Sequence, residues 1–229
     1  MQKREMKRSC YMEAAKALHE CLRTITGLLD PNRKVIDISA EYARLSAPLA
    51  SAQVVAGMPL CEALMALSQF MLLLQSRLLS IRRELDPLHS RYQFLDALIG
   101  KSQISIDANL EEQKRFNIEG LQDRSRWDAL RYQFGFQQSQ QQQLTEDQRD
   151  VGQQAQAHLN KMAEVLVDEM QSYPPLITEA LKCVRSELGF SFDEGTYLKS
   201  MQEAGAIAKT TIRAALNQMA ADLPKNEEP

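Results

Sequence analysis

Apolar residues recur with strict regularity through the second quarter of the chain, from Leu60 to Ile99. The steps between successive members alternate between four and three residues without a miss. A mean spacing of 3.5 residues predicts one long helix whose seam packs against other helices in a left-handed supercoil. The first eight members form the predicted dimer and core seam: Leu60, Leu64, Leu67, Met71, Leu74, Leu78, Ile81 and Leu85.

Proline interrupts this run at Pro87, where it removes one backbone hydrogen bond and clashes with the preceding turn. Because the apolar register continues beyond it through Leu88, Tyr92 and Leu95, we expect one helix that bends at Pro87. A looser helical pattern then extends to Phe134.

Two further helices are expected on either side of this one. Residues 137–143 read QQSQQQQ, and Thr145 with Gln148 matches a capping box, so we predict a turn near 138–146 and a third helix up to about residue 220. The first helix is predicted to end in a turn near 55–59. Kinks are expected in the first helix at Pro31 and in the third at Pro174, Pro175 and Gly189.

The predicted fold class is therefore all-α, with three long, kinked, antiparallel helices in an elongated coiled-coil bundle. At about 1.5 Å per residue the longest helices would reach on the order of 110 Å. A compact chain of this length has a radius of gyration of only about 17 Å. Such a bundle has a large surface for its volume, so we expect a second copy to cover the seam, with a heterodimer as an alternative. The three-helix domain spans 13–220, between a basic segment at 1–12 and a polar tail at 221–229.

Composition excludes several classes of protein. Only 9 glycines and 8 prolines are present, too few for the many turns of a β-sandwich or barrel, and a net charge of −3 disfavours nucleic acid as a partner. The chain has no P-loop, nucleophile elbow, HExxH or GxGxxG motif. Its three histidines are far apart and its 4 cysteines form no CxxC pair. We therefore expect no enzyme activity, cofactor or metal site.

The location of the protein is expected to be cytoplasmic. The charged start MQKREMKR is not followed by the apolar stretch of a secretory signal. The most apolar stretch, from Leu60 to Leu74, is interrupted by Glu62 and Gln69 and is too short to span a bilayer. Any membrane contact is therefore expected to be peripheral.

Basic residues are unevenly distributed, with an excess in the first 34 residues and many arginines in the second helix. Cations near an anionic bilayer each contribute about 1 kcal/mol, so several must act together. Two questions remain open. The arginines either face a membrane or pair with nearby acids such as Asp123, Asp128 and Glu119. The first segment is either an amphipathic helix on a membrane or a frayed terminus. The candidate membrane-binding residues are Lys3, Arg4, Lys7, Arg8, Arg82, Arg83, Lys114, Arg115, Arg124, Arg126, Arg131 and Lys161.

Four stretches resemble a BAR (Bin/Amphiphysin/Rvs) domain, and most closely the BAR region of sorting nexins. NRKVIDISAEYARLSAPLASAQ (32–53) resembles the end of a BAR first helix, and PLCEALMALSQFMLLLQSRL (59–78) the start of a second helix. DRSRWDALR (123–131) resembles the distal half of that helix, and MAEVLVDEMQSYPPLITEALKCV (162–184) the third. The chain departs from sorting nexins in having no room for a PX domain and a glutamine-rich rather than basic tip.

The resemblance implies an antiparallel dimer that forms a curved six-helix rod and binds anionic phospholipids or phosphoinositides. The expected function is a scaffold that senses or generates curvature in endocytic or endosomal traffic, peripherally attached to those membranes. The alternative is a cytosolic coiled-coil adaptor that binds proteins without lipid contact. A helical bundle from a pore-forming or secreted system is a third option, which the missing signal and spanning segment disfavour.

Overall fold

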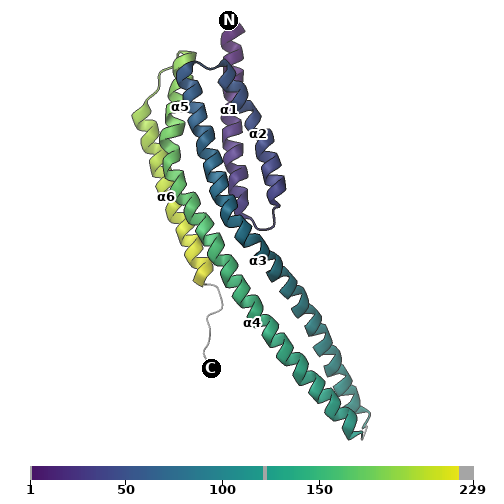
Figure 1. Ribbon diagram of the computed structural model, residues 1–229. Helices are drawn as coiled ribbons and strands as arrows, with labels where there is room; N and C mark the ends of the chain where they lie inside the picture. Colours follow the sequence, from purple (N-terminus) through teal and green to yellow (C-terminus); the bar gives the residue numbers. More distant parts are fainter. Residues whose placement is uncertain (1, 121–122, 222–229) are drawn as a thin grey trace. The chain divides into compact units, whose positions relative to one another are not determined.

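Every regular element in the part of the chain that the computed structural model describes, residues 2–120 and 123–221, is helical (Figure 1). The prediction of an all-α fold with long helices is thereby confirmed. Short 3-10 turns lie at Gly27–Leu29 and Met170–Ser172. The predicted tail lies, from residue 222 onward, outside the described residues. The helices are α1 (Gln2–Thr26), α2 (Val35–Val55), α3 (Met58–Ile118), α4 (Arg124–Glu169), α5 (Tyr173–Leu188) and α6 (Glu194–Ala221).

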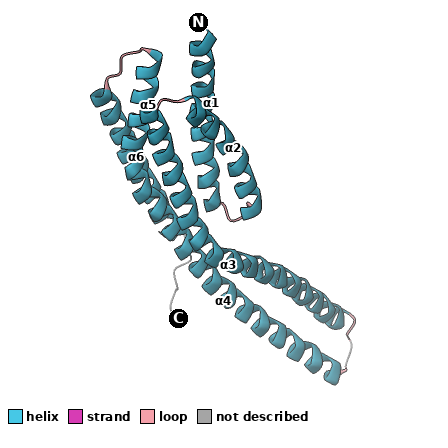
Figure 2. Cartoon of the chain, turned by 45° about the horizontal axis from the view of Figure 1, so that its top comes forward, coloured by secondary structure: helices cyan, strands magenta, loops and turns pink. Residues whose placement is uncertain are grey.

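The chain divides into two compact units. Unit 1 comprises residues 1–83 and 158–229, and unit 2 comprises residues 84–157. Figure 2 shows that helices make up nearly all of both, with short loops between them. Because α3 and α4 each contribute one part to each unit, the two units are described separately below.

The predicted first helix is in fact two helices, and Pro31 is not a kink inside either of them. The chain turns back between α1 and α2, which pack against each other in unit 1 (Figure 1). Pro31 lies in the connecting loop, where Asp30 has an extended backbone and its Oδ1 accepts a hydrogen bond from the Asn32 N–H at 3.0 Å. An extended residue before proline and an aspartate turn both end a helix, so the two apolar stripes fold onto each other.

Helix α3 runs unbroken through Pro87, and its predicted seam is buried inside this chain. The eight seam residues from Leu60 to Leu85 are each exposed by 6% or less. Leu64 lines a small hollow together with Leu18 of α1 and Ile177 of α5, and the ring of Phe70 packs 5.9 Å from that of Tyr173. The expectation that a second copy is needed to cover this seam is therefore wrong, because α1 and α5 already do so.

The turn predicted near 138–146 is also wrong, because α4 is continuous there. The Thr145 hydroxyl donates to the Gln141 carbonyl one turn earlier, as in a helix interior, instead of capping a new helix. Helix α3 ends at Ile118 and α4 begins at Arg124, and Gly120, just after α3, has a φ of 63°. Asp123 Oδ1 accepts a hydrogen bond from the Arg126 N–H at 3.1 Å, which starts α4.

Unit 2 is a hairpin of the second half of α3 and the first part of α4. Its glutamines are helical and bridge the two helices: Gln141 Nε2 donates to Gln103 Oε1 at 2.6 Å, and Gln148 Nε2 donates to Asp96 Oδ1 at 3.0 Å. Near the turn, Phe116 stacks on Trp127 with ring centroids 5.5 Å apart. Glutamine is a good helix former, so a run without apolar residues extends the helix instead of ending it.

The predicted third helix is divided into α4, α5 and α6. A 3-10 turn precedes α5, and Pro174 and Pro175 stand in the first turn of α5, where proline's missing N–H costs nothing. Gly189 is not a kink: with φ 75°, it ends α5 in a left-handed cap, and the Phe190 N–H donates to the Arg185 carbonyl at 2.8 Å. Helix α6 then folds back along α5 (Figure 1).

Candidate functional site

Arg82, predicted to bind membrane, is a buried structural residue. Its side chain is 2% exposed and reaches the loop between α1 and α2. Nη1 donates to the carbonyls of Leu28 and Asp30 at 2.8 Å, and Nη2 to those of Pro31 and Arg33 at 2.8 and 3.1 Å. The guanidinium satisfies carbonyls that the end of α1 leaves without partners, so it holds the α1–α2 loop on α3 and is not available to lipid.

The predicted cations of the first segment are largely tied to the end of α5. Residues 2–12 form the first turns of α1. Arg4 donates to the Leu188 carbonyl, and Lys7 forms an ion pair with Glu187. The Lys3 side chain lies outside the described residues. Arg8 is exposed, and among the described residues it has neither an ion-pair nor a hydrogen-bond partner.

Glu187 joins three parts of unit 1. Its carboxylate accepts hydrogen bonds from Lys7, from the Tyr11 hydroxyl at 2.7 Å and from the Gly57 N–H at 2.7 Å. Burial by itself would raise the pKa of Glu187, but these donors together hold that pKa below its usual value. Burial and the bond to Glu187 raise the pKa of Tyr11. The cluster is a structural lock between α1, the α2–α3 loop and α5.

Three predicted cations near the α3–α4 turn are paired with acids. Lys114 lies 2.6 Å from Glu111, and Arg126 donates to Glu112 at 2.8 Å. Arg115 lies 4.0 Å from Glu119. These residues are solvated helix faces, which matches the alternative that the sequence left open.

Five predicted cations are exposed and have neither an ion-pair nor a hydrogen-bond partner in the described part of the chain. Arg124 and Arg131 belong to unit 2, whereas Arg8, Arg83 and Lys161 belong to unit 1. Arg131 and Lys161 lie on the same helix, α4, so the turn predicted near 138–146 does not bring them opposite each other. The five cations are thus divided between the two units.

A second apolar face of α3 was missed from the sequence. Met58, Met65 and Leu72 are spaced by seven residues and are 72%, 46% and 55% exposed. Cys61 and Leu79 are half-buried between and beyond them on the same face. We call these five residues the outer stripe. The seven-residue spacing of Met58, Met65 and Leu72 could have revealed this face from the sequence. It was overlooked because the more regular apolar seam runs two positions away along the same helix.

Exposed apolar residues also mark unit 2. They lie on both helices of the hairpin and are 56–85% exposed. Large exposed aromatic side chains are enriched at protein–protein interfaces. The residues are Phe94, Ile104, Ile118, Tyr132 and Phe136.

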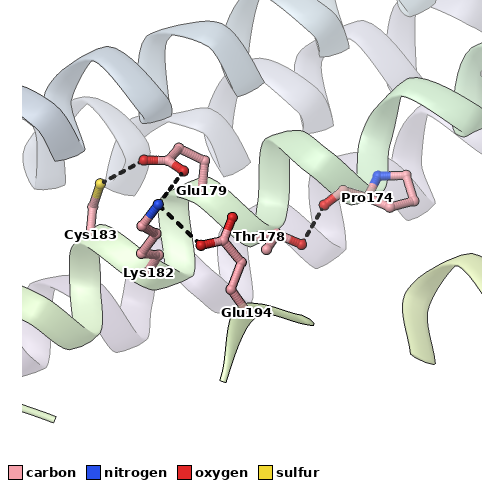
Figure 3. Close-up of polar contacts among 6 residues, drawn as sticks. All are labelled: Pro174, Thr178, Glu179, Lys182, Cys183 and Glu194. Atoms are coloured by element: carbon pink, nitrogen blue, oxygen red, sulfur yellow. Dashed lines mark hydrogen bonds and ion pairs between the residues drawn. The ribbon is translucent and has the colours of Figure 1, made fainter. Parts of the chain in front are cut away.

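Cys183 is the cysteine that lies beside charged groups in a surface hollow of about 450 Å³. Figure 3 shows Lys182 between Glu179 and Glu194, at 3.4 and 3.1 Å, with the Cys183 thiol directed toward Glu179 at 3.7 Å. Burial and the Glu179 carboxylate raise the pKa of Cys183, which disfavours the nucleophilic thiolate. In the described residues, no group of three or more His, Cys, Asp and Glu side chains is arranged to hold a metal ion.

Helix α3 contains one window that is long and apolar enough to cross a membrane, with a mean hydropathy of 1.4. By length and composition this helix qualifies, contrary to the expectation that no stretch is long enough. Of this window, 44% is buried. One such helix is weak evidence for a membrane span, since the core helix of a soluble protein passes the same test.

Comparisons with known proteins return no relative. No family model matches the chain, and no curated protein and no solved structure is similar to it. The residues described above are therefore the whole basis for a functional proposal.

Proposed function

We propose that this protein is a dimeric, BAR-type helical scaffold in which two copies associate through the outer stripe of α3. Exposed cations on each copy then attach the dimer to anionic membrane. Both parts are argued below from the exposure and pairing of individual side chains.

The exposure of the outer stripe carries the proposal. Met58, Met65 and Leu72 stand on one helix face with no covering helix among the described residues, although the neighbouring seam is fully buried. An exposed apolar row at heptad spacing is typical of a helix-packing surface. Its simplest complement is a helix with the same spacing, and a two-fold pair of α3 helices supplies one.

Five exposed cations support membrane attachment. Each cation near an anionic bilayer contributes about 1 kcal/mol, so Arg8, Arg83, Arg124, Arg131 and Lys161 of one copy give weak binding at best. A dimer presents two sets of these cations to the same membrane. Once one set is bound, the other is held near the membrane at a high effective concentration. Membrane attachment is therefore expected to depend on dimerisation.

The dimer is tested by light scattering after size-exclusion chromatography. The variant Met65→Glu/Leu72→Glu places two charges in the outer stripe of each copy, so we expect it to elute as a single copy with unchanged helicity by circular dichroism. Ile36→Glu is the matched control, because Ile36 is 73% exposed on α2, away from the stripe. An unaltered mass in the double variant would remove the proposed interface.

Membrane attachment is tested by co-sedimentation with phosphatidylserine vesicles at low salt. We expect Arg124→Gln/Arg131→Gln to reduce the bound fraction several-fold. The control Lys182→Gln removes a cation that is already neutralised by Glu179 and Glu194, and should leave binding unchanged. A folded dimer that stays in the supernatant would exclude the membrane role.

The exposed apolar residues of unit 2 support a second candidate, a protein-binding adaptor. Phe94 and Tyr132 are 62% and 79% exposed, and such rings serve as anchors in protein interfaces. In this case the dimer does not bind vesicles. A partner protein that co-purifies with the wild type is lost from Phe94→Ser/Tyr132→Ser but retained by Ile36→Ser.

A further inference from the structure

A half-open apolar cavity of about 340 Å³ lies within unit 1, between the end of α1, the junction of α4 with α5, and α6. Leu22 lines it from α1, Leu166 and Val167 from α4, and Met201 from α6. Pockets for small molecules measure about 300–1,000 Å³ and are mostly apolar. The cavity therefore has the size and lining of a site for an apolar chain, and neither the outer stripe nor the exposed cations are part of it.

Small residues of α6 create this space. Ala204 and Gly205 face the cavity, and a Cβ placed on Gly205 would meet no atom within 4 Å. Glycine is a poor residue for a helix interior, and no close contact at Gly205 requires it. A larger side chain at Gly205 therefore has room beside the cavity.

A cation stands at the edge of the cavity. Lys209 lines it and also lines an adjoining hollow of about 360 Å³, which Gln171 and Gln202 border. The nearest acid, Asp168, is 3.9 Å from the Lys209 ammonium, which is longer than a hydrogen bond. Since the Lys209 side chain is 32% exposed and only loosely paired, its hydrogen-bond donors are available to an anion.

We propose that this cavity binds a single-tailed amphiphile with an anionic headgroup. The tail occupies the apolar space beside Gly205, and the headgroup contacts Lys209 in the adjoining hollow, where the Gln202 amide supplies a further hydrogen-bond donor. The proposal does not rest on dimerisation or on the exposed cations, because the cavity lies within one unit of one chain.

The test is isothermal titration of the full chain with dodecanoate below its critical micelle concentration. We expect saturable binding of one dodecanoate per chain. Gly205→Leu should reduce the affinity at least tenfold, because its side chain occupies the tail site, and it should not unfold α6, because leucine is the better helix former. Gly135→Leu is the matched control, since a Cβ on Gly135 in α4 also meets nothing within 4 Å and lies outside the cavity.

The headgroup is tested with a charge variant and with other ligands. Lys209→Gln should weaken dodecanoate several-fold and leave 1-dodecanol unchanged, whereas Lys199→Gln on the same helix should change neither. Titration with lysophosphatidate separates a lipid phosphate from a free carboxylate as the preferred head. Absence of saturable binding of dodecanoate and lysophosphatidate, or equal affinities in Gly205→Leu and Gly135→Leu, would overturn the proposal.

Discussion

Unit 1 and unit 2 are both built from helices, but they are stabilised by different means. Unit 1 buries complete apolar stripes and places Arg82 against four carbonyls in its interior. Unit 2 has only two helices, a thin row of buried residues such as Ile106 and Leu130, and glutamine side chains that bridge the hairpin. Apolar burial contributes far more free energy than exposed amide contacts, so we expect unit 1 to carry most of the stability and unit 2 to open first.

The largest effect is expected at Arg82. Arg82→Met keeps much of the side-chain volume but leaves buried carbonyls without donors, each costing about 1–3 kcal/mol, so we expect a loss of about 4 kcal/mol or more. Arg83→Met is the control, because Arg83 is exposed and should stay within about 0.5 kcal/mol of the wild type. Urea denaturation followed by circular dichroism measures both. Equal values for the two variants would show that Arg82 is not part of the core.

Core truncation should affect the two units unequally. Leu74→Ala in unit 1 removes a fully buried side chain and should cost about 3 kcal/mol of global stability. Leu130→Ala in unit 2 should cost about 2 kcal/mol, with the loss of hydrogen-exchange protection confined to residues 84–157. If Leu130→Ala instead exposed unit 1 amides to the same extent, the two units would be one cooperative unit.

Glu187 predicts a pH dependence that belongs to unit 1. Burial acts to raise the pKa of Glu187, but bonds from Lys7, Tyr11 and Gly57 outweigh it and lower the pKa in the folded state. The carboxylate therefore stabilises unit 1 above its unfolded pKa, and this contribution is lost as the pH falls through the folded pKa. We expect Glu187→Gln to cost about 1–2 kcal/mol at pH 7 and to remove this acid-side loss.

The control for this experiment is Glu179→Gln, which alters an exposed carboxylate of the same helix. Denaturation at several pH values between 3 and 7 gives the free energy of unfolding, which should decrease equally with falling pH in the control and the wild type. The explanation fails if Glu187→Gln loses stability on acidification as steeply as they do.

The smallest effects on stability are expected at the start and in the interior of α4. Asp123→Ala removes the cap of α4 and should cost about 1 kcal/mol. Thr145→Ala replaces a residue in the interior of α4 by a better helix former and should stabilise the protein by a few tenths of a kcal/mol. Thermal denaturation of both variants provides the measurement. If Thr145→Ala lowered the melting temperature more than Asp123→Ala did, a helix start at Thr145 and a turn at 138–146 would be supported instead.

The sequence allowed the helical class, the seam of α3 and its continuation past Pro87 to be predicted, because heptad spacing is a local signal. The turns were harder. Thr145 and Gln148 matched a capping box, but inside a helix the Thr145 hydroxyl bonds to the Gln141 carbonyl instead. At the true connection, Gly120 and Asp123 formed a less distinctive sequence pattern. Gly189 was assigned a kink because a pattern does not specify a positive φ.

The candidate site was less predictable because it depends on tertiary contacts. Arg82 and Arg83 are adjacent arginines on one helix, yet one is buried on four carbonyls and the other is exposed. The outer stripe appears only once the seam has been assigned to contacts within the chain. Charge composition identifies neither feature, since it counts residues and not their neighbours.

The most direct test of the dimeric scaffold is sedimentation equilibrium of the full chain over a hundredfold range of concentration. The account predicts a mass that rises to twice the 26.0 kDa of one copy, and a mass of one copy throughout for Met65→Glu/Leu72→Glu. A wild-type protein that keeps the mass of a single copy at every concentration would contradict the account.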